Sequence, residues 1–216
     1  MDGLVFELEH YVAPPCPGDD KIARPHDEPS KSGFRGTVEG LGEVVVEHEG
    51  VGRRDGGPQR TRVEVRGAAV PAVVLTGRAV WGDLPSLDQA ELTVDGVAVP
   101  LKLNLLGAKK TQRALRFAHR NRSYTYSLLP KGRREGAELR RDQVCVRMEY
   151  FKNRKGLRTT RGTRGTISGT ADALDVALAV LFEQVDTNLL SLAGAAATAP
   201  FHLMDRMIRP SQWPGQ

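Results

Sequence analysis

The sequence predicts a mainly β fold, with about twelve antiparallel strands forming a closed barrel around one C-terminal hydrophobic helix. Short segments of alternating apolar and polar residues, separated by turn residues, follow one another from residue 34 to residue 168. The segment 171–192 then reads as a helix that is apolar on almost every side, so it must be buried on almost every side. The chain shows no strand–helix–strand alternation, which argues against a parallel α/β sheet.

The chain begins with a strand predicted within residues 1–12. From Leu4 to Val12 the apolar and acidic residues alternate, which is typical of a strand with one buried face. Residues 13–33 are rich in Pro, Gly and charge and are expected to form a loop or linker. Residues 34–192 then form the barrel with its helix, and residues 193–216 form a tail with one short helix, Phe201–Ile208.

The barrel strands are expected at regular intervals after this linker. Asp95-Gly96 lies between two alternating runs and predicts a type I′ hairpin turn. Pro100 predicts an edge position or a bulge in the strand that follows this turn. The expected strands are Phe34–Glu39, Glu43–His48, Arg60–Arg66, Ala72–Trp81, Ala90–Val94, Val97–Asn104, Ala114–His119, Ser123–Leu129, Ala137–Arg141, Gln143–Phe151 and Gly162–Ser168.

The C-terminal helix has a clear start. Thr170 or Asp172 is expected to cap it, and carboxylates in its first turn suit the helix dipole. The strand before the helix carries glycines at 162, 165 and 169. We expect them to permit close approach of the helix; the alternative is that their backbone amides, with Arg161 and Arg164, hold a phosphate.

The ending GTISGTADALDVALAVLFEQVD resembles that of the tubby-like barrels, the superfamily that includes the tubby C-terminal domain, the phospholipid scramblases and the LURP-one-related proteins. The shared pattern is a final strand, a small-residue turn, an Asp and an apolar helix that runs to a terminal Asp. The resemblance covers about Phe34 to Leu192 and rests on no signature peptide. It implies a closed barrel that wraps a central helix.

Positive charge is concentrated in one part of the chain. The segment 109–164 has 18 Lys and Arg residues and four acids, a net charge of +14, whereas the whole chain carries +5. The rest of the chain is therefore at −9, and a field segregated in this way attracts polyanions. The candidate anion-binding residues are Lys109, Lys110, Lys131, Arg133, Arg134, Arg140, Arg141, Lys152, Arg154, Lys155, Arg158, Arg161 and Arg164.

The sequence predicts a binding protein rather than an enzyme. It contains no HExxH, GxSxG, P-loop or GxGxxG motif, so no catalytic residue, metal site or cofactor is expected. The first hypothesis is a tubby-like barrel whose basic face binds an anionic membrane surface, such as lipid headgroups, or another acidic partner. The alternatives are a nucleic-acid-binding barrel, in which Tyr124, Tyr126, Tyr150 and Phe151 stack on bases, and an assembly subunit that binds proteins through its C-terminal tail.

The expected location is the cytoplasm, with possible peripheral attachment to a membrane. The N-terminus lacks the pattern of a signal peptide, and the longest apolar run is too short and too charged to span a bilayer. Cys16 and Cys145 show no metal-binding spacing and are expected to be reduced.

Overall fold

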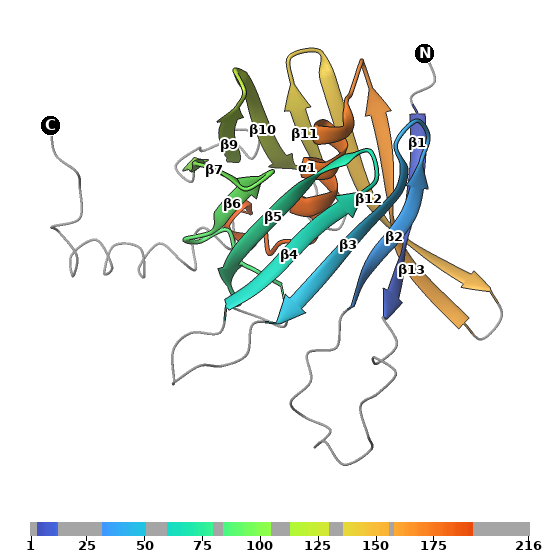
Figure 1. Ribbon diagram of the computed structural model, residues 1–216. Coiled ribbons are helices and arrows are strands. Elements are labelled where there is room, and N and C mark those ends of the chain that lie inside the picture. Colours follow the sequence, from blue (N-terminus) through green and yellow to red (C-terminus); the bar gives the residue numbers. More distant parts are fainter. Residues whose placement is uncertain are drawn as a thin grey trace, which may run out of the picture.

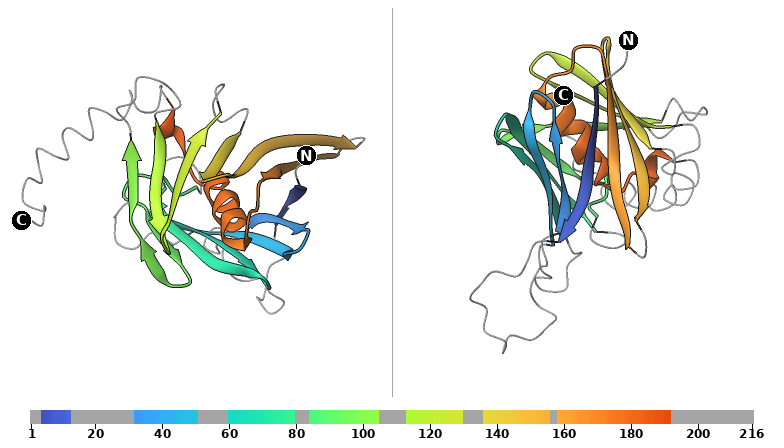
Figure 2. Two further views of the ribbon diagram at one scale, coloured as in Figure 1. Left: turned by 90° about the horizontal axis from the view of Figure 1, so that it is seen from above. Right: turned by 90° about the vertical axis from the view of Figure 1, so that its right-hand side faces the viewer.

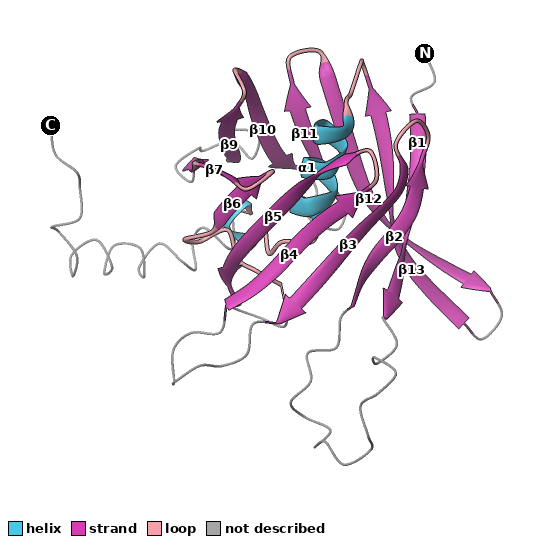
Figure 3. Ribbon diagram, viewed as in Figure 1, coloured by secondary structure: helices cyan, strands magenta, loops and turns pink. Residues whose placement is uncertain are grey.

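The computed structural model describes residues 4–12, 32–50, 60–79, 84–104, 113–129, 136–155 and 158–191. The tail 193–216, with its predicted short helix, and all but the last two residues of the predicted linker 13–33 lie outside these ranges. Within them the chain forms a mainly β structure with a single α-helix, as the sequence predicts (Figure 3).

Thirteen strands occur among the described residues, and every predicted strand is found, most with small changes at the ends. The strands are β1 (Leu4–Val12), β2 (Ser32–Val38), β3 (Gly42–Gly50), β4 (Arg60–Gly67), β5 (Val70–Arg78), β6 (Glu91–Val94), β7 (Val97–Val99), β8 (Leu101–Asn104), β9 (Ala114–His119), β10 (Arg122–Leu128), β11 (Ala137–Arg141), β12 (Val144–Lys155) and β13 (Arg158–Ser168).

The strands form one antiparallel sheet that curls into a nearly closed barrel (Figures 1 and 2). Apart from the change of edge at Pro100, each strand pairs with its neighbours in sequence, and β1 pairs with β13 to join the two ends of the chain. The two edges of the sheet are β7 and β8, which are consecutive in the chain and separated only by Pro100. Proline has no amide hydrogen for the ladder. It therefore divides the predicted strand Val97–Asn104 at the point where the chain passes from one edge to the other.

The helix α1 (Ala173–Glu183) lies inside the barrel, where Figures 1 and 2 show strands around it. All ten residues from Leu174 to Glu183 are buried, and the apolar ones among them belong to the same core as the inward-facing side chains of the sheet, such as Leu8, Val65 and Met148. This confirms that the apolar helix occupies the core. The barrel provides the enclosure that a helix without a polar face requires.

The helix is shorter than the predicted segment 171–192. It ends at Glu183, and a short 3-10 helix, η3 (Asn188–Leu190), follows. Between the two, the Asp186 amide donates a hydrogen bond to the Pro85 carbonyl at 2.8 Å. Leu189 and Leu190 are buried nevertheless, because apolar content predicts burial and does not locate the last turn of a helix.

Asp172 caps the helix, and it is one of the two residues, Thr170 and Asp172, that were predicted to do so. Its carboxylate accepts hydrogen bonds from the amides of Leu174 and Asp175, at 3.0 and 3.1 Å, and the Asp175 carboxylate accepts one from the Asp172 amide. This reciprocal arrangement is a capping box. It satisfies amides that the first turn of a helix leaves without intrahelical partners.

Replacing Asp172 by alanine should lower the free energy of unfolding by about 0.5–2 kcal/mol, because the cap is lost. Partial burial raises the pKa of Asp172, but hydrogen bonds from Arg122 and from the Asp175 amide outweigh it and lower the pKa overall. The contribution of this charge is therefore complete above the unfolded pKa of about 3.9, and it is lost as the pH falls through the folded value. Urea titrations between pH 3 and 7 test this. Asp172→Asn, which keeps a capping oxygen but carries no charge, should lose less stability than Asp172→Ala at pH 7 and should not show the part of the pH dependence that comes from this carboxylate.

The glycines before the helix have a different role from the one predicted. A Cβ on Gly165 would lie 2.1 Å from the ring of Phe6, which is directly opposite on β1, and one on Gly162 would lie 2.5 Å from the ring of Phe151 on β12. Gly169 has φ of +83°, and a Cβ there would lie 2.4 Å from the Gln143 carbonyl oxygen. At 162 and 165 the close contacts are thus with aromatic rings on neighbouring strands rather than with the helix.

Candidate anion-binding site

The thirteen predicted anion-binding residues fall into three groups. Lys109, Lys110, Lys131, Arg133 and Arg134 lie outside the described residues. Arg140, Arg141 and Arg164 have described side chains on the barrel wall. The other five, all on the distal part of the β12–β13 hairpin, are placed by their backbone in the sheet register: Lys152, Arg154, Lys155, Arg158 and Arg161.

Arg141 pairs with a buried carboxylate of the central helix. Its guanidinium donates two hydrogen bonds to the carboxylate of Asp175 on the helix, at 2.9 and 2.6 Å. The Asp175 side chain is only 1% exposed and that of Arg141 is 15% exposed. The hydrogen bonds to Asp175 raise the pKa of Arg141 above its ordinary value, so the guanidinium stays charged. This arginine fixes the first turn of the helix to β11.

Both ends of the helix are held to the barrel wall by polar side chains. At the first turn, Arg122 on β10 forms an ion pair with the cap Asp172, beside the pair made by Arg141. At the last turn, the hydroxyl of Tyr126 donates to the Phe182 carbonyl at 3.2 Å, and that of Tyr150 donates to the Glu183 carbonyl at 3.0 Å. The last carbonyls of a helix lack the usual amide four residues on; the Phe182 carbonyl also accepts a hydrogen bond from the Val185 amide at 3.3 Å. Two of the tyrosines proposed to stack on bases are thus bonded to the helix.

Arg140 and Arg164 are exposed but paired with carboxylates of the same face. Arg140 binds Glu138 at 2.8 Å, and Arg164 on β13 binds Glu7 on β1 at 2.6 Å. The hydrogen bonds that Arg140 donates to Glu138 raise the pKa of the guanidinium. Carboxylates on the barrel wall therefore form ion pairs with arginines of the basic segment 109–164 and neutralise part of its positive charge.

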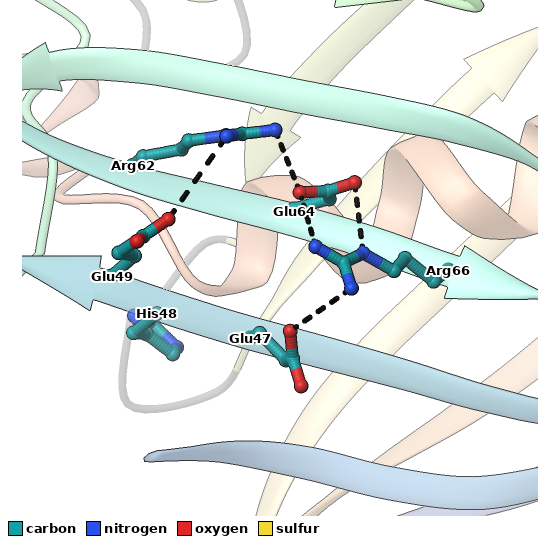
Figure 4. A pocket seen from close by; sticks show the side chains of 6 residues that line it. All are labelled: Glu47, His48, Glu49, Arg62, Glu64 and Arg66. Carbon is teal, nitrogen blue, oxygen red and sulfur yellow. Dashed lines mark hydrogen bonds and ion pairs between the residues drawn. The ribbon is translucent and has the colours of Figure 1, made fainter. Parts of the chain in front are cut away.

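A shallow pocket on β3 and β4 is filled with paired charges as well (Figure 4). Arg62 binds Glu64 at 2.7 Å and lies 4.0 Å from Glu49, and Arg66 binds Glu64 at 2.9 Å and lies 3.5 Å from Glu47. Its three carboxylates and two guanidiniums leave a net negative charge. This pocket is a cross-strand ion-pair ladder and does not favour an anion.

The distal part of the β12–β13 hairpin projects from the barrel (Figure 1, lower right). In the register, β11 reaches only Met148 on β12, and β1 reaches only Gly162 on β13. Residues 152–155 and 158–161, which we call the arm, pair with each other and with no other described strand. The predicted strands on this hairpin end at Phe151 and begin again at Gly162. The chain continues as strand because its basic residues tolerate a strand and the β-branched Thr159 and Thr160 favour one.

The arm differs from the barrel in how its charges are arranged. Lys152 lies directly opposite Arg161, and Lys155 lies directly opposite Arg158. Directly opposed like charges destabilise a strand pair, by up to about 1 kcal/mol. The sequence from Tyr150 to Ala171 contains no acid, so no carboxylate of the arm itself compensates them.

Like charges also oppose each other on the barrel wall, where a residue of opposite sign compensates most of them. Arg60 opposes Arg78 and binds Glu91 at 2.9 Å, and Glu47 opposes Glu64 with Arg66 in contact with both. The exception is Lys102 opposite Arg116, an exposed pair on β8 and β9 that our sequence interpretation did not single out. Its spacing of fourteen residues gives no local signal.

The remaining aromatic residues of the basic segment are also part of the barrel. Tyr124 is 1% exposed and stacks on Phe117, with ring centroids 5.0 Å apart. Phe151 covers Gly162 near the base of the arm. Tyr124 and Tyr126 are buried and cannot stack on a nucleobase, whereas Tyr150 is 40% exposed and has its hydroxyl on the Glu183 carbonyl. Within the described part of the segment, the arm is the stretch that holds the remaining predicted cations. Besides its cations it carries Asn153, Thr159 and Thr160, which the sequence interpretation had not singled out.

Other kinds of site find no support in the described part of the chain. No group of three or more His, Cys, Asp and Glu side chains is placed to hold a metal ion there. The Cys145 thiol is free and half-buried, and burial raises its pKa; Cys16 lies outside the described ranges. None of the helices in these ranges has the length and apolar character needed to cross a membrane. Comparisons of the chain with protein-family models, with curated proteins and with solved structures gave no match.

Proposed function

We propose that this protein is a non-enzymatic binding protein whose basic arm engages a phosphate-bearing anionic ligand. The observation that carries the proposal is the pair of directly opposed cations, Lys152 with Arg161 and Lys155 with Arg158, on a hairpin that extends beyond its neighbouring strands. An anion placed between opposed cations removes their repulsion. Lipid headgroups and nucleic acids both display such phosphates, and Arg and Lys are the side chains that bind them.

The arrangement of the remaining charges supports the arm as the place of contact. Arg140, Arg141 and Arg164 already hold carboxylates of this chain, so an external anion would have to displace them. The five cations of the arm face no such competition from an acid in the arm. The arm also projects beyond the neighbouring strands of the barrel (Figure 1).

Reversing the charge of Lys152, Arg154, Lys155 and Arg158 to glutamate should abolish most retention on heparin and on vesicles that contain anionic lipid. The wild type should elute from heparin at higher salt than the variant. Its exposed cations attract the anionic matrix, and salt has to screen that attraction, which acts over about 8 Å at physiological ionic strength. The melting temperature should change little, because charges on an exposed hairpin contribute little to stability. Salt-gradient elution, vesicle co-sedimentation and thermal melts measure the three quantities.

Two double variants that change the net charge equally distinguish binding by the arm from binding by the overall charge of the protein. Lys155→Glu/Arg158→Glu and Lys102→Glu/Arg116→Glu each reverse one opposed like-charge pair, and each lowers the formal net charge by the same amount. The arm variant should lose far more retention than the β8–β9 variant. Equal losses would show that the barrel binds through its overall charge, and no loss in either would contradict the proposed function.

We also propose that the chain is a member of the tubby-like barrels. A nearly closed antiparallel barrel, with strands that follow the chain order and a helix that comes after the last strand and lies inside, supports this placement. An experimental structure of the chain, superposed on a tubby C-terminal domain, tests it. The expected result is the same strand order around a helix of the same direction; a different order would refute the placement.

A further inference from the structure

We infer that the ligand of the arm is double-stranded DNA, with the arm inserted as a two-stranded ribbon into the major groove. The inference rests on the proposed function and adds the class of ligand to it. It is carried by three features of the arm: its dimensions, the presence of cations on both of its faces, and the chemistry of its neutral residues.

The dimensions of the arm match a DNA groove. Its two strands are held in register over four residue pairs, from Lys152 opposite Arg161 to Lys155 opposite Arg158. At about 3.4 Å per residue this ribbon is roughly 13 Å long, and its strands lie about 4.8 Å apart. The major groove of B-form DNA is about 12 Å wide and about 8.5 Å deep and admits a two-stranded ribbon.

The register distributes cations over both faces of the ribbon. Successive strand positions alternate between faces, and directly opposed positions share one. Positions 152, 154 and 161 therefore belong to one face and positions 155 and 158 to the other. A flat membrane contacts one face of such a ribbon and leaves the other in water. A groove has a phosphate backbone on each side and contacts both.

The neutral residues of the arm suit the floor of a groove better than a bilayer. Across residues 152–161 the sequence holds Asn153, Thr159 and Thr160, with Leu157 as the single apolar residue and no aromatic residue. Elements that bind at a membrane interface insert Trp, Phe or Leu side chains. Asn bonds to adenine, and Thr bonds to base edges or contacts the thymine methyl group, in the major groove.

The test measures binding of a labelled 20-base-pair DNA duplex by fluorescence anisotropy, with duplex RNA of the same sequence and vesicles of 30% phosphatidylserine for comparison. If five cations meet phosphates, affinity should fall by roughly 500-fold between 50 and 200 mM salt. Duplex RNA should bind more weakly, because the major groove of an A-form helix is too narrow for the ribbon. Vesicles should bind more weakly than duplex DNA at equal phosphate concentration.

Two variants, one for each face, test the insertion. Lys152→Ala/Arg154→Ala/Arg161→Ala and Lys155→Ala/Arg158→Ala should both weaken DNA binding, and the second should reduce the salt slope by about two. Lys102→Ala/Arg116→Ala, an opposed pair on the barrel wall, should leave binding close to wild type. Melting temperatures near wild type for all three would show that the losses come from missing contacts.

The possible outcomes separate the inference from the proposed function. Tighter binding to vesicles than to duplex DNA, or dependence on one face only, would overturn the DNA assignment and leave the anion-binding arm in place. A β8–β9 variant as weak as the arm variants would overturn both. Failure to bind DNA, vesicles and heparin alike would also overturn both.

Discussion

Replacing Leu178 by aspartate should abolish folding to soluble protein. Leu178 is fully buried at the middle of the central helix, with strands of the barrel around it. A carboxylate there would lose its hydration without gaining a partner, which costs several kcal/mol at least. The free energy of unfolding of a domain is only about 5–15 kcal/mol. The soluble fraction after expression and the cooperativity of thermal unfolding measure the effect.

Two control variants test whether the loss of folding comes from burying a charge at position 178. Leu178→Ala, which creates a cavity without burying a charge, should fold and lose about 2–5 kcal/mol. Val97→Asp changes an apolar residue of β7 that is 57% exposed and should stay within about 0.5 kcal/mol of wild type. Soluble and cooperatively melting Leu178→Asp would mean that the helix is not enclosed by the barrel.

Replacing Arg141 by alanine should destabilise the protein by about 3–5 kcal/mol, the second largest effect that we expect. The change leaves Asp175, whose side chain is 1% exposed, as a buried charge without its bidentate partner. It also frees the first turn of the helix from β11. Urea unfolding at pH 7 measures the loss, and Arg141→Lys should recover only part of the stability because lysine cannot form both hydrogen bonds in the same plane.

Arg164→Ala is the control for this variant. Arg164 forms an ion pair of similar length with Glu7, at 2.6 Å, but the two side chains are 51% and 44% exposed. Exposed ion pairs contribute about 0–1 kcal/mol. If both alanine variants were destabilised equally, burial of Asp175 would not be the cause, and the account of Arg141 as the anchor of the helix would be wrong.

Local patterns identified the strands because each hairpin is specified by neighbouring residues. The turn Asp95-Gly96 shows this: both residues have positive φ, of 49° and 79°, as the predicted turn type requires. Alternation likewise placed Phe6 and Leu8 inside and Glu7 outside. Pairing of strands that follow one another needs no information from distant parts of the chain.

The errors arose where the answer depends on distant residues. After the helix ends at Glu183, the Asp186 amide donates a hydrogen bond to the Pro85 carbonyl, about a hundred residues away in the chain. The glycines at 162 and 165 face Phe151 and Phe6, which are neighbours only through the register. The sequence interpretation treated Arg141 and Arg164 as free cations because their partners, Asp175 and Glu7, are 34 and 157 residues away in the chain. Arg140 differs, because its partner Glu138 is only two residues away on the same face of β11, a local pairing that the interpretation overlooked.

The sequence by itself determined the β class, the positions of the strands, the burial of the helix and the concentration of positive charge. Each of these follows from composition and from periodicity over a few residues, which act locally. Only the tertiary structure decided which charges lie together: Arg141 binds Asp175 in the core, whereas the strand register sets Lys155 directly opposite Arg158 on the arm. Charge compensation depends on distances of a few ångströms between residues far apart in sequence, because the Coulomb energy falls with separation and is screened by solvent.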